Sequence, residues 1–504
     1  MSDDYLPRIL NARVYDVAVE TPLHTAARLS KRLECPVLLK REDLQPVFSF
    51  KLRGAYNKIY QVCRQSRPEK VISASAGNHA QGVAYAARKM GIRSLIVMPR
   101  TTPPIKVDAV KALGAKTELV GDSYDEAYEH AQSLVSGERI PFIHPYDDPD
   151  VIAGQGTIAT EILRQHPDNL RAVFVPVGGG GLIAGVAAYI KALKPDIKVI
   201  GVEPTDAACF KAAIDAGRRV KLNQVGLFAD GVAVRQVGRE PFRLARSLID
   251  DIITVDSDEI CAAVKDVFED TRSIAEPAGA LSVAGVKRFV KETGDADGAL
   301  VAIVSGANMN FDRLRHVAER AELGERREML MAVEVPEKPG SFRTFCRALG
   351  KRSITEFNYR YADSKRAYIF AGVELTEGAN QQQEILNRLI AKGFHVTDVT
   401  DNEMAKLHIR YMVGGHPPPL GNERLLRLEF PERPGALLSF LEILQPEWNI
   451  SLFHYRNHGA AYGRVLVGLQ IPDRAWADFV RSLRQLGYQH REETENPAYS
   501  MFLR

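Results

Sequence analysis

The sequence predicts an α/β protein over its first two-thirds, followed by two small ferredoxin-like units of βαββαβ order. From about Ala74 onward, short runs rich in valine and isoleucine alternate with segments of helical periodicity. This pattern is typical of parallel strands joined by crossover helices. Beyond residue 328 the chain repeats itself, and each copy has the pattern strand, turn, helix, strand, strand, helix, strand. The length of 504 residues agrees with about three domains.

The α/β region contains clear candidate strands and helices. We expect strands at residues 70–73, 94–98, 172–177, 199–202 and 300–304, and helices at 79–90 and 105–113, the second closed by Gly114. In such sheets the loops that follow the carboxyl ends of the strands carry the chemistry. Three of the four motifs described below follow a predicted strand directly.

The repeat rests on two pairs of matching segments. Pro339-Gly340 is echoed by Pro434-Gly435 at an offset of 95 residues, and residues 357–360 are echoed by residues 453–456 at an offset of 96. One inserted residue therefore separates the copies. We expect an α/β domain at 1–318, a charged linker at 319–328, a first repeat domain at 329–402, a second linker at 403–422 and a second repeat domain at 423–495.

The composition is that of a globular protein without a charged partner. Hydrophobic residues make up 45% and charged residues 26%, and the net charge is only +3, so nothing indicates binding to nucleic acid or a membrane. The five cysteines have no spacing typical of zinc or redox motifs, so we expect thiols in a reducing cytoplasm and no metal site. The N-terminus lacks the features of a signal peptide. The uncharged run 172–190 contains a proline and four glycines, which argue against a membrane span.

The first motif is the segment Ser49–Ala55, which contains Lys51 between Phe50 and Leu52. A lysine at the start of a helix, capped by Ser49 and flanked by apolar side chains, favours the neutral amine. A neutral lysine can attack an aldehyde and form a Schiff base. Taken alone, Lys51 fits an ordinary solvated lysine on a surface helix better than a Schiff-base lysine.

The second motif is the segment 73–82, which lies between a predicted strand and a predicted helix. Small residues there leave backbone N–H groups free at a helix N-terminus, where a substrate carboxylate can bind. Ser75, Gly77, Asn78 and His79 are the candidate contacts, and Asn78 can also reach a ring oxygen. The alternative is a simple capped turn between strand and helix.

The third motif is a run of four glycines, Gly178, Gly179, Gly180 and Gly181, followed by Leu182. Without side chains the backbone can wrap closely around a phosphate, to which several N–H groups then donate. The run is neither a dinucleotide fingerprint nor a P-loop. A tight turn remains the alternative.

The fourth motif follows the last strong strand of the α/β region. Ser305 lies at the carboxyl end of this strand, where its hydroxyl can bond a heterocyclic nitrogen. A helix cap is the alternative role for this serine.

In this order and spacing the four motifs resemble the fold-type II (tryptophan synthase β-like) family of pyridoxal-phosphate enzymes, and within it the biosynthetic threonine dehydratases. The similarity covers essentially the whole chain. It includes Glu276–Ala280, which looks like a turn near the cofactor in that family, and the two repeats, which resemble ACT-like regulatory domains. The resemblance implies a catalytic domain of two subdomains with pyridoxal 5'-phosphate as cofactor.

The resemblance also implies roles for individual residues. Lys51 is the Schiff-base lysine, Asn78 binds the ring hydroxyl, Gly178 to Leu182 hold the phosphate, Ser305 contacts the pyridine nitrogen, and Ser75, Gly77, Asn78 and His79 form the substrate-carboxylate loop. The implied reaction is the dehydration and deamination of L-threonine to 2-oxobutanoate and ammonia, the first committed step of isoleucine synthesis. Isoleucine as inhibitor, valine as its antagonist and a homotetramer are implied as well.

Other hypotheses about the function stay open at this point. Within the same family, a serine dehydratase, a serine racemase or a short catabolic threonine dehydratase would share the four motifs, although the repeats argue against all three. A non-catalytic amino-acid sensor would have no evident need for Lys51. A nicotinamide-dependent oxidoreductase would depend on the glycine run alone, and the repeats could serve only oligomerisation.

Overall fold

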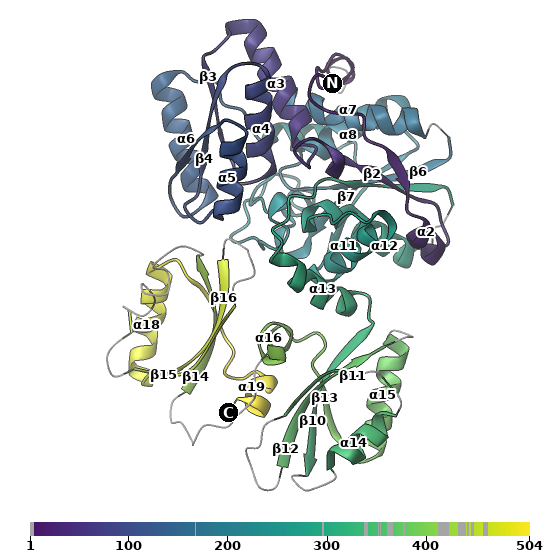
Figure 1. Ribbon diagram of the computed structural model, residues 1–504, viewed down its shortest axis with the longest axis vertical. Coiled ribbons are helices and arrows are strands. Elements are labelled where there is room, and N and C mark those ends of the chain that lie inside the picture. Colours follow the sequence, from purple (N-terminus) through teal and green to yellow (C-terminus); the bar gives the residue numbers. More distant parts are fainter. Residues whose placement is uncertain are drawn as a thin grey trace. The chain divides into compact units, whose positions relative to one another are not determined.

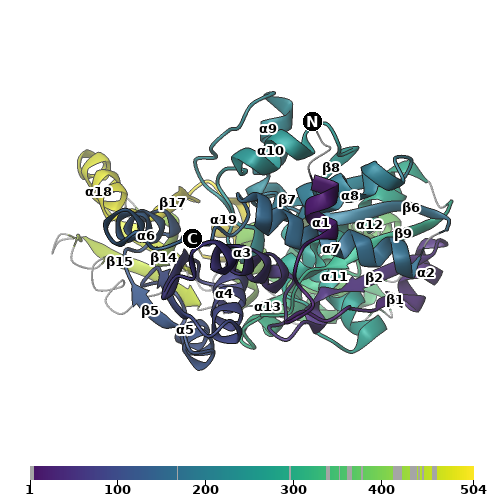
Figure 2. The same cartoon turned by 90° about the horizontal axis from the view of Figure 1, so that it is seen from above.

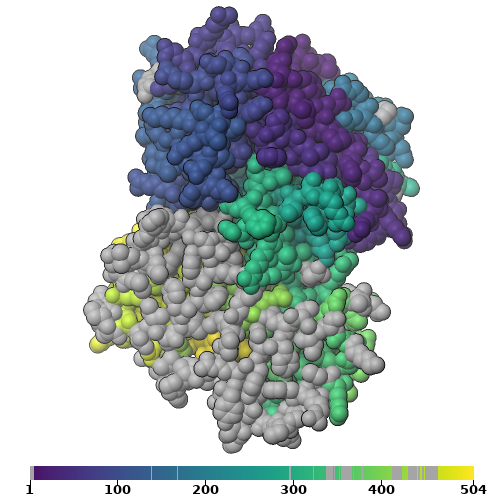
Figure 3. Space-filling model, in the orientation of Figure 1, coloured from purple at the N-terminus to yellow at the C-terminus, as the bar shows by residue number. Residues whose placement is uncertain are grey.

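The computed structural model divides the chain into two compact units, Met1–Ala321 (unit 1) and Glu322–Arg504 (unit 2). Figure 1 shows the helices and strands of both units. The described residues are 5–166, 168–294, 297–336, 341–350, 352, 354–359, 366–375, 379–411, 423–431, 440, 443–444, 448–456 and 462–503, and the remainder is drawn in grey in Figure 3. In this described part, no helix is long and apolar enough to span a bilayer.

A six-stranded sheet forms the centre of unit 1. Its strands run in the order β1 (Leu23–Thr25), β2 (Val37–Arg41), β9 (Ala299–Val304), β6 (Leu170–Pro176), β7 (Lys198–Pro204) and β8 (Asp251–Val255). The edge strand β1 is antiparallel to β2, and the other neighbours are parallel. The carboxyl ends of β9, β6 and β7 therefore lie along one edge, where the loops of a parallel sheet carry their chemistry.

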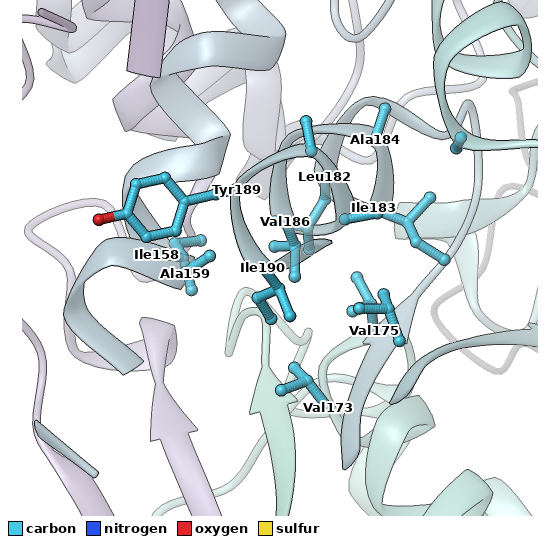
Figure 4. Close-up of a cluster of buried hydrophobic side chains, with 14 of the residues drawn as sticks. Ile158, Ala159, Val173, Val175, Leu182, Ile183, Ala184, Val186, Tyr189 and Ile190 are labelled. Carbon is cyan, nitrogen blue, oxygen red and sulfur yellow. The ribbon is translucent and has the colours of Figure 1, made fainter. Parts of the chain in front are cut away.

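Helices cover both faces of this sheet because its strands are apolar on both sides. In β6, Val173 and Val175 face one buried cluster, whereas Ala172 and Phe174 face another. Figure 4 shows the first cluster, in which Val173 and Val175 lie beside residues of one covering helix. Figure 1 shows α7 and α8 on one side of the sheet and α11 and α12 on the other. These helices span Pro149–Gln165 (α7), Gly181–Leu193 (α8), Ser257–Thr271 (α11) and Pro277–Thr293 (α12).

A smaller parallel sheet forms the second part of unit 1. It contains β3 (Lys70–Ala74), β4 (Arg93–Met98) and β5 (Lys116–Leu119). Figures 1 and 2 show it with its helices, apart from the six-stranded sheet. The helices near it are α3 (Lys51–Ser66), α4 (Asn78–Lys89), α5 (Pro104–Ala112) and α6 (Tyr124–Glu138). The expected division of the first domain into two subdomains is therefore confirmed.

The predicted strands and helices of unit 1 are all present, with ends that differ by two residues at most. Gly114 follows α5 in the left-handed region, at φ +94°, as expected of a glycine that ends a helix. The strands β1, β2, β5 and β8 were not predicted. The remaining short helices of unit 1 are α1 (Tyr5–Leu10), α2 (Ala27–Leu33), η1 (Glu42–Leu44), η2 (Thr205–Ala207), α9 (Cys209–Asp215), η3 (Asp230–Val232) and α10 (Arg239–Ala245), and α13 spans Arg313–Gly324.

Unit 2 contains the two repeats as two four-stranded antiparallel sheets. Their strand orders are β11-β12-β10-β13 and β15-β16-β14-β17, the same order in both copies and that of a ferredoxin-like fold. The Pro-Gly turns at 339–340 and 434–435 lie outside the described residues. The first copy contains β10 (Glu328–Pro336), α14 (Ser341–Leu349), β11 (Ile354–Tyr359), β12 (Arg366–Glu374), α15 (Ala379–Ala391) and β13 (His395–Asp398). The second contains β14 (Glu423–Pro431), β15 (Asn449–Arg456), β16 (Tyr462–Gln470), α18 (Asp473–Gln485) and β17 (Gln489–Glu492), with α16 (Glu403–Leu407), η4 (Ile409–Tyr411) and α19 (Pro497–Phe502) outside the two sheets.

Helices α3 and α7 cross at a pair of glycines. A Cβ atom on Gly154 of α7 would lie 2.7 Å from the Cα of Gly54 in α3 and 2.8 Å from the carbonyl oxygen of Arg53. The two backbones therefore touch without room for a methyl group. Because α3 begins with Lys51, this crossing fixes the helix that carries the candidate lysine.

We predict that Gly154→Ala destabilises the protein by about 1–3 kcal/mol, because the new methyl group meets backbone atoms that cannot rotate away. Chemical denaturation of the full-length chain measures the change. The matched control is Gly137→Ala in α6, where a Cβ atom would meet nothing within 4 Å. Equal stability of the Gly154→Ala variant and the unsubstituted chain would contradict the close crossing.

Candidate active site

Lys51 and Ser305 come together because two loops pair through their backbones. Ser49 forms an isolated antiparallel bridge with Gly306, and the N–H of Phe50 donates to the carbonyl oxygen of Ser305 at 3.3 Å. Helix α3 starts at Lys51, with Phe50 rather than Ser49 at the capping position. The Ser49 hydroxyl nevertheless accepts a hydrogen bond from the Lys51 N–H at 3.3 Å. Two motifs far apart in sequence thus occupy one site.

The Lys51 amine lies in partly apolar surroundings. The side chain is half-buried, its Nζ is 5.2 Å from the centre of the Phe50 ring, and it donates to the carbonyl oxygen of Pro145 at 3.5 Å. Burial lowers the pKa of Lys51 to about 8, while the nearby carboxyl group of Glu276 opposes this shift. An appreciable fraction of the amine is therefore neutral near neutral pH.

Asn78, the first residue of α4, connects three parts of the site. Its Nδ2 donates to Oε1 of Glu276 at 2.5 Å, across 198 residues of sequence. Its Oδ1 accepts from Nδ2 of Asn308 at 2.7 Å, and the same nitrogen donates to the carbonyl oxygen of Val47 at 2.8 Å. Asn78 therefore lies where the loop after β9, the start of α12 and the segment before Lys51 meet.

Glu276 is a buried carboxyl group at the start of α12. Burial, together with the charge of Asp230, raises its pKa to about 7, against the opposing effect of the hydrogen bond from Asn78. A Cβ atom on Gly306 would lie only 2.4 Å from Oε1 of Glu276. Position 306 therefore requires glycine for this carboxyl group to fit.

The glycine run lies at the N-terminus of α8, as predicted, and is tightly packed. Gly180 caps the helix with φ +89°, and no side chain caps it. A Cβ atom on Gly179 would lie 2.2 Å from the Tyr146 ring, and one on Gly178 would lie 2.9 Å from the Cα of Val232. Because the first N–H groups of a helix have no partner within it, this end of α8 can bind an anion.

The glycine run and the lysine motif are linked through two adjacent residues. Tyr146 packs against Gly179 and Gly181, and its neighbour Pro145 accepts the hydrogen bond from the Lys51 amine. The anion site at α8 and the amine at α3 are therefore held by the same short segment of chain.

Ser305 lies at the carboxyl end of β9 and is buried. Its hydroxyl donates to the carbonyl oxygen of Ala278 at 3.3 Å, and its N–H donates to the carbonyl oxygen of Gly279 at 3.3 Å. The hydroxyl hydrogen can rotate from Ala278 toward another acceptor, such as a heterocyclic nitrogen.

The second motif places its four residues at the start of α4. The Ser75 hydroxyl accepts from the N–H of Gly77 at 3.4 Å, and no side chain caps the helix. His79 is buried and its Nε2 donates to the carbonyl oxygen of Ile143 at 2.9 Å, so its Nδ1 carries no proton. Burial lowers the pKa of His79 to about 3, which keeps the ring neutral. His79 therefore offers no positive charge to a carboxylate.

Sequence reasoning did not select Glu276 as a site residue, and it missed Asp230 entirely. Asp230 lies in η3, with Nζ of Lys106 at 2.5 Å and Nη1 of Arg313 at 3.4 Å. Burial alone would raise its pKa, but these two cations outweigh burial and lower it to about 2. Its neighbour Gly231 faces Glu276 and Asn78. The family resemblance had marked Glu276–Ala280 as a turn near the cofactor, whereas no sequence pattern marked Asp230.

Comparisons with known proteins place this site in a family. Residues 14–306 match the model of the pyridoxal-phosphate dependent enzymes, and residues 319–409 and 417–503 match the C-terminal regulatory domain of threonine dehydratase. The chain is 56% identical to the biosynthetic L-threonine dehydratase of Burkholderia multivorans, over 100% of this chain and 99% of the relative. It is 54% identical to the enzyme of the same name from Escherichia coli, over 99% and 97%.

A solved structure of a threonine deaminase has a fold similar to that of this chain. The processed form of threonine deaminase isoform 2 from Solanum lycopersicum superposes with a TM-score of 0.63 at 50% identity, covering 64% of this chain and 88% of that one. The sequence matches extend over the full length, and the structural match covers the larger part of the chain. The chain therefore belongs to the family of pyridoxal-phosphate dependent enzymes and, within it, to the biosynthetic threonine dehydratases.

Proposed function

We propose that the protein dehydrates and deaminates L-threonine to 2-oxobutanoate and ammonia with pyridoxal 5'-phosphate as its cofactor. The observation that carries the proposal is the Lys51 amine, which burial brings to a pKa of about 8 at the first residue of α3. Relatives with full-length similarity carry the name threonine dehydratase.

The described residues fit the proposed cofactor. Lys51 would hold its aldehyde carbon, and the uncapped start of α8 would hold its phosphate, with Gly178 to Leu182 as donors. The hydroxyl of Ser305 and the amide of Asn78 supply neutral hydrogen-bonding groups for a ring nitrogen and a ring hydroxyl. When bound, pyridoxal phosphate supplies an electron sink for negative charge at the α-carbon of an amino acid.

We assign two tasks to Lys51. It would anchor the cofactor, and its Nζ, when free, would accept the α-proton of the substrate. The lowered pKa supports this assignment because a neutral amine is needed for both tasks. Ser305 cannot carry a negative charge at neutral pH, so it would not hold a ring nitrogen protonated as a carboxylate would. A weaker electron sink favours prompt loss of the β-hydroxyl.

The substrate carboxylate would bind at the start of α4. Ser75, Gly77, Asn78 and His79 surround backbone N–H groups that no side chain caps. The neutrality of His79 leaves the backbone and hydroxyl groups as the donors there.

We further propose that the two repeat domains, at 329–402 and 423–495, bind isoleucine as inhibitor and valine as its antagonist. The matched regulatory domain of threonine dehydratase supports an effector role for unit 2.

We also propose that the protein forms a homotetramer, which analytical ultracentrifugation would measure. We propose a cytoplasmic location as well, in keeping with the free thiols of Cys35, Cys63, Cys209 and Cys261.

Lys51→Ala should abolish both the visible absorbance of bound pyridoxal phosphate and the formation of 2-oxobutanoate from threonine. Even without loss of the cofactor, removal of the amine that accepts the α-proton should reduce kcat by about 10²–10⁴-fold. Lys58→Ala is the matched control, because Lys58 lies on the same helix about two turns beyond Lys51 and its amine pairs with Asp148 at 2.7 Å. A visible band that survives in the Lys51→Ala protein would refute the assignment.

Glu276→Gln should make the Lys51 amine reactive at lower pH. The Glu276 carboxyl group raises the pKa of Lys51 against burial, so removing its charge should bring that pKa below about 8. The pH dependence of Lys51 acylation in the cofactor-free protein, read by peptide mass spectrometry, measures the shift. The control is Glu292→Gln at the exposed far end of the same helix, and an identical profile in all three proteins would contradict the proposed interaction.

Isoleucine should bind the full-length protein and weaken threonine binding by about 5–150-fold, the usual range of allosteric coupling. Threonine must then weaken isoleucine binding by the same factor. Equilibrium dialysis of each ligand with and without the other, under conditions without turnover, tests this reciprocity. Absence of isoleucine binding, or binding that leaves threonine affinity unchanged, would rule out control through unit 2.

A further inference from the structure

A network of four charged side chains lies beneath the first turn of α3. Lys40 of β2, Glu42 of η1, Arg53 of α3 and Glu161 of α7 are all 0% exposed. Two cations and two anions make the group neutral. Such complete burial of charges requires full pairing and hydrogen bonding.

Arg53 uses all five of its N–H donors within this network. Its Nε and Nη2 donate to the two carboxyl oxygens of Glu42, each at 2.8 Å. Its Nη1 donates to Oε1 of Glu161 at 2.6 Å and to the hydroxyl of Thr157 at 3.1 Å. The remaining donor, on Nη2, reaches the carbonyl oxygen of Val19 at 3.2 Å. The planar guanidinium group is therefore fixed in one orientation.

The Lys40 amine likewise donates all of its hydrogen bonds within the protein, on the other side of Glu161. Its amine donates to Oε2 of Glu161 at 2.6 Å, to the carbonyl oxygen of Thr21 at 2.6 Å and to Oε1 of Gln165 at 3.1 Å. Both carboxyl oxygens of Glu161 thus have a cationic donor. The network has no unused donor on either cation.

The network anchors the first turn of α3, the helix that begins at Lys51. Arg53 is the third residue of the helix that begins at Lys51, and it connects that turn to η1 through Glu42 and to α7 through Glu161. At the next residue, Gly54, the backbones of α3 and α7 touch. Arg53 therefore anchors the turn whose first residue carries the amine.

A contribution to folding stability does not by itself explain why these four charges are buried. Buried ion pairs are often no more stabilising than apolar residues of similar volume, and in some proteins they select one geometry instead. We propose that Arg53 is a positioning residue, which sets the Lys51 amine through the Glu42 and Glu161 carboxylates. The inference rests on the proposed role of Lys51.

Arg53→Lys is the main test, because lysine keeps the charge but cannot bond both carboxylates in a planar fork. We expect a folded protein with kcat lowered about 10–100-fold, an almost unchanged KM for threonine and an altered pH dependence of Lys51 acylation in the cofactor-free chain. Tyr15→Phe is a milder second variant, since the half-exposed Tyr15 donates to Oε1 of Glu161 at 2.8 Å. It should lower kcat by about two- to tenfold.

Asp266→Asn is the matched control, because Asp266 of α11 is buried and bonds Arg32 at 2.5 Å and Lys287 at 2.8 Å, on a helix that carries none of the site residues. It should lower the unfolding midpoint without changing the acylation profile of Lys51. If Arg53→Lys and Tyr15→Phe are folded and keep the original kcat and acylation profile, the positioning role is wrong. Should the unsubstituted protein fail to turn over threonine, the proposed function is wrong, while the acylation profiles still test Arg53.

Discussion

The backbone pairing of Ser49 with Gly306 is the contact on which the geometry of the candidate active site depends. It joins the start of α3 to the loop after β9, so that Lys51 and Ser305 become neighbours. Gly306 can take part only because it has no side chain, since Glu276 occupies the space where a Cβ atom would lie. One backbone contact between two remote segments therefore sets the positions of an amine, a hydroxyl group and a carboxyl group.

Burial and neighbouring charges give the titratable groups of this site different pKa values. It lowers the pKa of Lys51 to about 8 and raises that of Glu276 to about 7, so both groups change protonation near neutral pH. Asp230 is affected by burial too, but Lys106 and Arg313 hold its pKa near 2. Environments that separate the pKa values of neighbouring carboxyl groups separate their roles. Asp230 stays charged and holds α5 against η3 through Lys106, whereas the Glu276 carboxyl group donates and accepts a proton near neutral pH.

The fold could be predicted from the sequence wherever apolar residues follow a regular period. The strands 172–177 and 300–304 are continuous apolar runs because helices cover both of their faces, and the repeat in unit 2 gave its strand order directly. Strand β2 was missed although it lies next to β9, because Lys40 and Arg41 interrupt its pattern. These charges look like surface residues in sequence, and only the structure supplies the carboxylates that allow them to be buried.

The candidate site was predictable only in the residues that carry their own signal. Lys51 has a reactive amine, and the glycine run lacks side chains, so each motif suggests a chemistry, and their order and spacing with the other two motifs decide between that chemistry and its alternative. Glu276 and Arg53 act through partners elsewhere in the chain, and a glutamate or arginine between apolar residues has many possible roles. Asn78 shows both cases at once. Its place at a helix start was visible, but its hydrogen bond to Glu276 spans 198 residues and exists only because the fold brings the starts of α4 and α12 together.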